Sequence, residues 1–259
     1  MTAPPEEVIE LVSKSGNSFH AKVARWMQGD GWHVAISPYY MDQSQSKARE
    51  IDLVAEKAWP IRDDFNRLVG DVVVRLFVEC KFIPAYSVFW FADKDAKAAE
   101  RLVCSVPAFS VDNIYTNKHH YLRDSPRVAK LYSTNVGKNL ENDPYYRALN
   151  QVLNGMVAMR GRQLLTELKR HPRSKLVLLE FPVIVCSSFE PMFAVDFFTD
   201  TVPQQIASNF HFETQYAYVD AGGGHRTEHL LIDFIEFNQL QKFSRAITED
   251  AEAAAYLAS

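Results

Sequence analysis

Two short apolar segments of this chain each carry a carboxylate where a buried strand would ordinarily carry an apolar side chain. The first is residues 49–55, Arg-Glu-Ile-Asp-Leu-Val-Ala, and the second is residues 76–82, Leu-Phe-Val-Glu-Cys-Lys-Phe. Both are predicted to be β-strands. Because side chains alternate across a strand, we expect Glu79 and Lys81 to share one face and Cys80 to point to the other.

Two interpretations of these charged residues are open. In the first, Glu79 and Lys81 form an ion pair on a solvated strand edge. The flanking residues 71–78 are nearly continuously apolar, however, which indicates a strand covered on both faces. Buried charges are usually paired or bound to metals. In the second interpretation, Asp52 and Glu79 supply the hard oxygen ligands that Mg²⁺ prefers, with the backbone carbonyl of Cys80 as a further ligand.

Lys81 has a role in the second interpretation as well. An ammonium group beside two metal-binding carboxylates can position or activate a water, or stabilise negative charge that develops in the reaction. A metal that binds the attacking water and neutralises a phosphate is the usual chemistry of phosphodiester hydrolysis. An acid on one strand and an acid-x-Lys sequence on a following strand is the pattern of such a site.

At these residues the chain resembles the PD-(D/E)XK nuclease superfamily. Asp52 is similar in position to the first metal-binding acid of that family, Glu79 to the second, and Lys81 to the lysine. The order of predicted elements is also similar: helix, strand, strand with the acid, strand with acid-x-Lys, helix. The resemblance extends to about residue 185. It implies an α/β fold with a restriction-endonuclease-like mixed central sheet flanked by helices, and a nuclease that uses Mg²⁺ or Mn²⁺.

The helix predicted before the first acid contains a further candidate ligand. Asn17 or Ser18 is a suitable N-cap, and apolar residues follow at helical spacing. His20 stands where resolvase-like members of the superfamily usually have a glutamate. A neutral imidazole can bind a divalent metal and would favour Mn²⁺ over Mg²⁺, although a histidine with only a packing role is the alternative. We expect Glu50 to lie on the same strand face as Asp52, either as a supporting ligand or facing solvent.

A long helix is predicted from Tyr145 to about Lys169, with Pro144 in its first turn. Gln151 on this helix is a candidate supporting residue, because several members of the superfamily carry a glutamine on a later helix near the metal. A plain polar helix face is the alternative. The end of the helix and its exit are basic and would either contact phosphates or form a solvated helix end. These candidate nucleic-acid contacts are Arg160, Arg162, Lys169, Arg170 and Arg173.

The remaining segments set the expected organisation. Residues 107–128 are predicted to form a solvated surface loop, with a substrate-contacting loop as the alternative. His119 and His120 are expected to point apart, so that a chelating pair is not expected. The chain is predicted to form a single nuclease-like domain, with a core at about 5–187. A β-rich C-terminal extension follows at about 188–247, and 248–259 is expected to be an acidic, frayed helical tail.

Composition limits the partners and the compartment. The net charge of −4 disfavours a general nucleic-acid coat but not a nuclease, whose site is acidic. Three distant cysteines without a CxxC pair and the lack of a membrane-length apolar run favour a cytoplasmic protein that has no disulfide framework.

The expected partner is nucleic acid, DNA favoured over RNA, with a homodimer or a partner subunit as open options. The resemblance implies a role in restriction or phage defence. The alternatives are an RNA-cleaving effector and a catalytically inactive nucleic-acid-binding or scaffold module of the same fold.

Overall fold

A ten-stranded mixed sheet runs through the computed structural model, which describes residues 4–42, 47–82, 85–134, 143–162, 165, 174–220 and 222–259. The strand order is β1-β4-β5-β8-β12-β11-β7-β6-β9-β10. The strands are β1 (His33–Ile36), β4 (Leu53–Arg62), β5 (Leu68–Lys81), β6 (Ser87–Asp93), β7 (Arg127–Thr134), β8 (Lys175–Cys186), β9 (Met192–Asp196), β10 (Gln204–Gln205), β11 (Phe210–Val219) and β12 (His225–Glu236). A separate antiparallel pair is formed by β2 (Tyr39–Asp42) and β3 (Lys47–Glu50).

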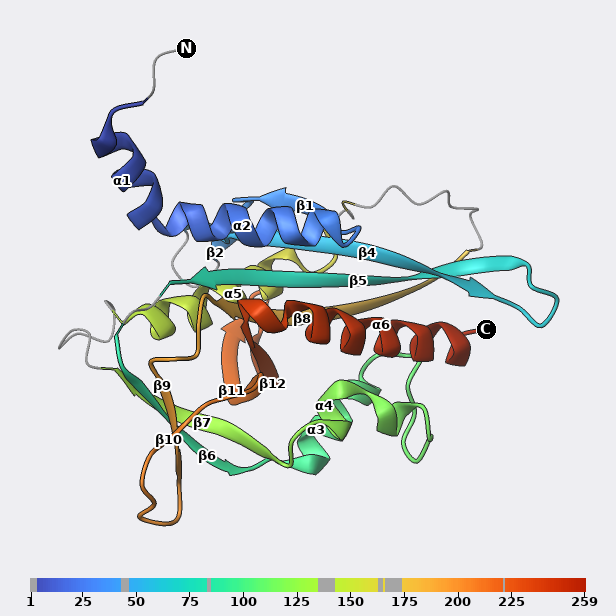
Figure 1. The fold of residues 1–259 in the computed structure, drawn as a ribbon. Helices are drawn as coiled ribbons and strands as arrows, with labels where there is room; N and C mark the ends of the chain where they lie inside the picture. Colours follow the sequence, from blue (N-terminus) through green and yellow to red (C-terminus); the bar gives the residue numbers. More distant parts are fainter. Residues whose placement is uncertain are drawn as a thin grey trace.

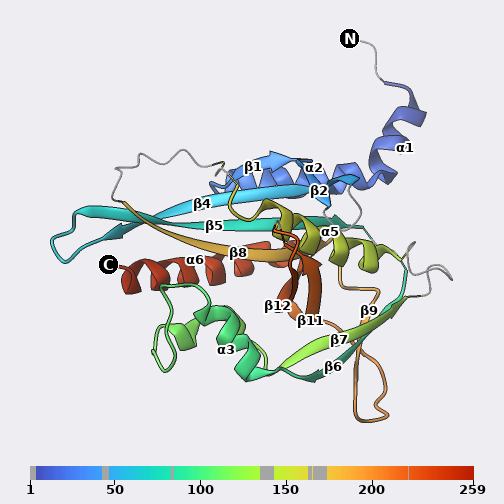
Figure 2. The ribbon, with the colours of Figure 1, turned by 180° about the vertical axis from the view of Figure 1, so that it is seen from behind.

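Helices cover both faces of the sheet. In Figure 1, α2 and α6 lie in front of the long strands, and Figure 2 shows α5 on the opposite side. The helices are α1 (Glu6–Lys14), α2 (Gly16–Gly29), α3 (Ala96–Cys104), α4 (His120–Arg123), α5 (Pro144–Met159) and α6 (Leu240–Leu257). The molecule is therefore an α/β protein with a large mixed sheet flanked by helices, as the sequence predicts.

Side chains that alternate across β5 pack into two separate apolar cores, one on each face of the sheet. Val74, Leu76 and Val78 pack with residues of α2 and α6 in what we call the first core. Phe77 packs with residues of α5, β11 and β12 in the second core. The strand lies between β4 and β8, so both of its edges are paired. This double cover explains the nearly continuous apolar sequence of residues 71–78.

Residues 49–55 do not form one strand, contrary to the prediction. β3 ends at Glu50 in the two-stranded sheet, Asp52 lies in a bend, and β4 begins at Leu53 in the large sheet. The amide of Ile51 donates to the carbonyl of Pro38, and the carbonyl of Asp52 accepts from the amide of Ser37. Because the chain changes sheets here, Glu50 and Asp52 do not share a strand face.

The β-rich C-terminal extension joins the large sheet, whereas the prediction of a frayed tail at 248–259 is wrong. β12 pairs in parallel with β8, so the region continues the sheet from its middle. Residues 248–257 belong to α6, and Ile247, Ala251 and Ala254 are buried in the first core. The alanines that suggested a weak tail form the small, buried stripe of an amphipathic helix.

Two further predictions fail in this part of the chain. His119 and His120, at the start of α4, are 3% and 1% exposed, so the predicted surface loop does not include them, although most of 110–118 is exposed or half-buried. Their rings stack with centroids 4.9 Å apart and do not point apart. The helix α5 ends at Met159 rather than near residue 169, while Lys169, Arg170 and Arg173 lie outside the described residues. Among the residues described, no helix has both the length and the apolar character that a membrane crossing requires.

Candidate metal centre

Asp52 and Glu79 meet at the end of the β4–β5 pair. The two strands are antiparallel with Leu53 opposite Val78, and one step further along this register brings Asp52 opposite Glu79. The amide of Asp52 donates to Glu79 Oε1 over 3.3 Å, and the amide of Cys80 donates to Asp52 Oδ2 over 2.7 Å. These two hydrogen bonds fix both carboxylates relative to the backbone.

Lys81 extends this pair on the same side of the strand. Its Nζ lies 2.8 Å from Glu79 Oε2, which confirms that the two side chains share a face. Cys80 packs against the first core on the other face. Its amide contacts Asp52, whereas the sequence predicts a role for its carbonyl. Glu79 and Lys81 thus form an ion pair, as in the first interpretation of the sequence. The pair lies on β5, an interior strand of the sheet, and not on a solvated edge.

Burial sets the electrostatics of the two carboxylates. Glu79 is fully buried, and Lys81 is 18% exposed at its side chain. Burial raises the pKa of Glu79 to about 7; the ammonium of Lys81 opposes this rise and the charge of Asp52 adds to it. Like charges that face each other across two strands are destabilising unless a cation compensates them. One lysine compensates only part of this charge.

His20 lies on α2, which begins at the end of the sheet where β5 ends (Figure 1). Its Nε2 is buried and has no hydrogen-bond partner. The helix packs against the first core, which is the face of β5 that carries Cys80 rather than Glu79. His20 therefore has an unsatisfied ring nitrogen, and its helix begins at the end of the sheet where Glu79 lies. The helix packs, however, on the face of β5 opposite to Glu79.

Gln151 and Glu50 hold the segment that leads to Asp52. Gln151 Nε2 donates to the carbonyl of Glu50 over 3.3 Å, and the hydroxyl of Tyr40 donates to the carbonyl of Gln151 over 3.3 Å. The Glu50 side chain is a hydrogen-bond partner of Tyr39, whose pKa it raises. Gln151 thus ties α5 to the end of β3 and contacts neither carboxylate.

Tyr40 is a residue near this centre that the sequence analysis does not single out. It is 1% exposed, and burial chiefly raises the pKa of its hydroxyl, with a smaller contribution from the charge of Glu79. Exposed and buried positions alternate over β2 in the structure, but its sequence, Tyr-Tyr-Met-Asp, does not alternate in polarity, so no sequence signal marked this residue. Tyr40 is part of the second core.

The described basic residues after α5 are engaged within the protein. Arg160 Nη2 lies 2.8 Å from Glu228 Oε2, and Arg160 Nε lies 3.9 Å from Glu180. Arg162 is exposed and donates to the carbonyl of Tyr39 over 3.3 Å. Arg160 is thus largely neutralised by its partners, which leaves Arg162 as the better candidate for a phosphate contact.

Searches of protein-family models, curated proteins and solved structures each found no match to this chain. The chemistry of the site is therefore judged from its own residues. Asp52 and Glu79 contribute two carboxylates. Within the described ranges, the groups of three or more histidine, cysteine, aspartate or glutamate side chains close enough to share a metal ion lie elsewhere, around His120.

Proposed function

We propose that the chain is a divalent-metal-dependent nuclease with a restriction-endonuclease-like core, acting most readily on DNA. The observation that carries this proposal is the pairing of Asp52 with Glu79 at the ends of two neighbouring strands, with Lys81 bonded to Glu79. Two carboxylates that face each other, with Glu79 buried and Asp52 half-buried, destabilise a fold unless a cation binds between them.

The arrangement of elements supports the same core. The helix α2 precedes β1, and β1, β4 and β5 are antiparallel neighbours in that order. β8 then pairs in parallel with β5, and α5, which precedes it in the chain, packs against both strands. With the intervening elements left aside, this order is similar to the helix–strand–strand–strand–helix order of the resembled superfamily, which supports the proposal. The helix α3, which follows β6 in the chain, packs against β12 and α4.

The residues present fit a divalent metal. Two carboxylates leave room for the several waters that Mg²⁺ retains in proteins. His20, the further ligand that the sequence predicts, would increase the preference for Mn²⁺. Its Nε2 is unpartnered, but its helix packs on the opposite face of β5 and it is not grouped with Asp52 and Glu79, so the proposed site depends on the two carboxylates. When bound, the metal would lower the pKa of a coordinated water and neutralise charge on the phosphate.

The remaining contributions come from the chain itself. The amide of Cys80 orients Asp52, and Lys81 orients Glu79. The ammonium of Lys81 also places a positive charge where negative charge develops on a phosphodiester during cleavage. Lys81 is thereby the residue that we expect to act on the reacting group, directly or through a water.

The test is cleavage of supercoiled plasmid, linear duplex, single-stranded DNA and RNA by the purified protein with Mg²⁺ or Mn²⁺. We expect metal-dependent cleavage that EDTA abolishes and that Asp52→Ala, Glu79→Ala and Lys81→Ala each remove. Glu190→Ala is the matched control, because Glu190 is an exposed carboxylate outside the site. Cleavage at the wild-type rate by all three site variants would refute the assignment.

Complete burial of Glu79 favours one rival, a catalytically inactive nucleic-acid-binding or scaffold module of the same fold. The rival predicts no cleavage and no metal binding by calorimetry. Preferential cleavage of RNA would instead identify an RNA-cleaving effector. Metal binding without cleavage would indicate that a partner subunit supplies part of the active enzyme.

A further inference from the structure

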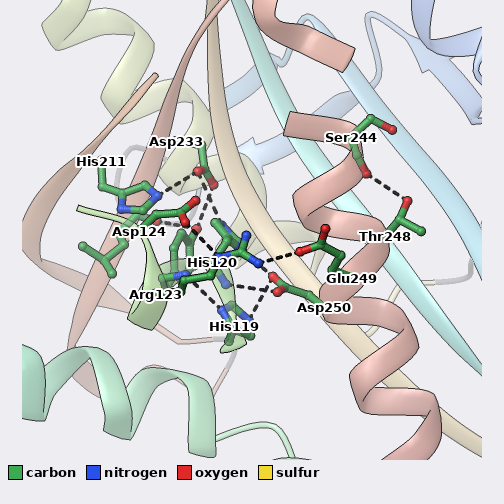
Figure 3. Close-up of polar contacts among 12 residues, drawn as sticks. His119, His120, Arg123, Asp124, His211, Asp233, Ser244, Thr248, Glu249 and Asp250 are labelled. Carbon is green, nitrogen blue, oxygen red and sulfur yellow. Dashed lines mark hydrogen bonds and ion pairs between the residues drawn. The ribbon is translucent and has the colours of Figure 1, made fainter. Parts of the chain in front are cut away.

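A second group of ionisable side chains is buried far along the chain from the carboxylate pair. Its histidines come from the start of α4 and from β11, and its aspartates come from β12 and α6 (Figure 3). None of its members is more than 6% exposed. They are His119, His120, His211, Asp233 and Asp250. So many ionisable groups are costly to bury unless each is paired or bound to a metal.

Three of these residues have the spacing of metal ligands. His120 Nε2 and His211 Nε2 lie 3.5 and 3.3 Å from Asp233 Oδ1. Two ligand atoms bound tetrahedrally to one zinc ion, each at about 2.0–2.1 Å, are about 3.3 Å apart. The three donor atoms all lie within 4.8 Å of one another, which is close enough for them to share a single ion.

The hydrogen bonding of the cluster is incomplete. His120 Nε2 and His211 Nδ1 are buried and have no hydrogen-bond partner. The 3.5 Å separation between His120 Nε2 and Asp233 is longer than an N–H···O hydrogen bond. A buried polar atom without a partner costs about 1–3 kcal/mol. A metal ion bound by His120 Nε2 would satisfy that nitrogen, whereas His211 would bind through Nε2, the atom that faces Asp233, and not through Nδ1.

An outer layer of contacts holds the same residues in place. His120 Nδ1 bonds to Asp250 Oδ2, and the amide of His120 donates to Asp250 Oδ1 over 3.0 Å. The hydroxyl of Tyr121 lies 3.1 Å from Asp233 Oδ2. Metal-binding histidines usually donate their other ring nitrogen to a carboxylate in this way, which directs the free nitrogen at the metal.

The group is accessible from solvent. His120, His211 and Asp233 all line a cavity of about 600 Å³. Exposed residues at its edge include Arg123 and Lys242. The three buried residues therefore border a space that could hold an ion together with a water or another small ligand.

We propose that His120, His211 and Asp233 form a binding site for a divalent transition-metal ion, Zn²⁺ first, with one coordination position open to this cavity. Two imidazoles and one carboxylate favour such an ion over Mg²⁺, which prefers oxygen ligands. The site is separate from the Asp52–Glu79 pair and does not depend on the proposed nuclease activity.

The neighbouring group of His119, His120 and Asp250 is a poorer candidate. His120 Nδ1 and Asp250 Oδ2 already bond to each other, and His119 Nδ1 accepts from the amide of Tyr121. Most of its donor atoms are used within the protein. Asp250 is therefore an orienting residue for His120.

The first test is titration of the EDTA-treated, full-length protein with Zn²⁺, Co²⁺ and Mg²⁺ by calorimetry. We expect one equivalent of Zn²⁺ or Co²⁺ to bind and to raise the melting temperature. His211→Gln and Asp233→Asn should lose this equivalent, while Tyr121→Phe should weaken binding about 10–100-fold. His229→Gln, a histidine of the same strand as Asp233, should bind like the wild type. Glu79→Gln should also retain it, which separates this site from the proposed nuclease centre.

X-ray absorption of the zinc-loaded wild-type protein provides a measurement that does not depend on folding of a variant. We expect imidazole and oxygen ligands without sulfur, because the proposed site contains no cysteine. The free thiols of Cys80, Cys104 and Cys186 are the competing ligands that this measurement would detect. Sulfur coordination would overturn the proposal. So would a folded wild-type protein that binds no transition metal, since the cluster would then be a structural ion-pair network. Equal binding by a folded His211→Gln variant would also overturn it.

Discussion

Two charge pairs with opposite properties lie along β4 and β5, one within the paired strands and fully buried, the other at their end with Asp52 half-buried. On β4 and β5, Glu56 lies opposite Arg75, and one step beyond the paired region Asp52 lies opposite Glu79. The first pair joins opposite charges and the second joins like charges. Both Glu56 and Glu79 are 0% exposed, so burial does not distinguish them.

The Glu56–Arg75 pair is satisfied by the protein itself. Arg75 Nε donates to Glu56 Oε1 over 2.7 Å, and its other nitrogens donate to the carbonyls of Met159 and Arg162 over 3.3 Å. Glu56 Oε2 accepts from the amide of Leu165 over 2.7 Å. These contacts join β4 and β5 to the end of α5, so the pair has an evident structural role.

The Asp52–Glu79 pair has no comparable compensation. Lys81 is its one cationic partner among the described ion pairs, and the pKa of Glu79 rises to about 7 because of burial. The comparison teaches that sign, rather than burial, separates a structural charge pair from a candidate ion-binding pair. Neutralising the first pair should damage the fold, whereas neutralising the second should damage function.

The largest expected effect is on cleavage. Asp52→Asn and Glu79→Gln keep the shape of the side chains and remove the negative charge, so we expect cleavage to fall about 1000-fold or more, equivalent to about 4 kcal/mol. Rates are measured on the preferred substrate with saturating metal, with Glu190→Gln as the control. A similar loss in the control, or unchanged cleavage in the site variants, would break the comparison.

The next effect is on stability. Arg75→Ala leaves Glu56 buried without its partner, and we expect the free energy of unfolding to fall by about 3–5 kcal/mol. Urea denaturation followed by circular dichroism measures the change. Arg226→Ala is the control. Arg226 forms a surface ion pair with Asp220 at a turn, and loss of this pair should lower the free energy of unfolding by under about 1 kcal/mol. A small effect of Arg75→Ala would mean that the pair is not structural.

A third effect is a pH-dependent change in stability, and it is opposite in sign to that of Arg75→Ala, because removing the charge of Glu79 should stabilise the fold. Glu79 has a folded pKa of about 7, above its ordinary value, so ionisation favours the unfolded chain as the pH rises from about 4.5 to 7. Glu79→Gln cannot ionise. In EDTA, we expect the variant and wild type to be equally stable near pH 4 and the variant to be about 3 kcal/mol more stable above pH 7.

Stability in urea across this pH range, measured for both proteins, tests the expectation. Adding Mg²⁺ at pH 8 should reduce the difference, because the ion stabilises the wild type by mass action. A variant less stable than the wild type at pH 8 in EDTA would show that Glu79 has a net structural role.

The smallest effect concerns Gln151. Its bond to the carbonyl of Glu50 is a single neutral hydrogen bond, so Gln151→Ala should lower the free energy of unfolding by about 1 kcal/mol. The metal concentration that gives half-maximal cleavage should not change, because Gln151 contacts neither carboxylate. A shift in that concentration would instead place Gln151 near the metal.

Local patterns in the sequence determined several elements of this protein. The strand at residues 71–81 and the shared face of Glu79 and Lys81 follow from the two-residue period of a strand. The N-terminus of α3 is likewise set locally, because Asp95 accepts a hydrogen bond from the amide of Ala98. These features depend on neighbours within a few residues, so a single chain is enough to predict them.

Only the tertiary structure decided the rest. The change of sheets at Ile51 depends on contacts with Pro38 and β2, and the burial of α6 depends on strands far along the chain. The histidine cluster joins His120 to Asp250 across 130 residues. Such contacts require chain segments to meet through long loops, and no periodic pattern in the sequence records which segments will meet.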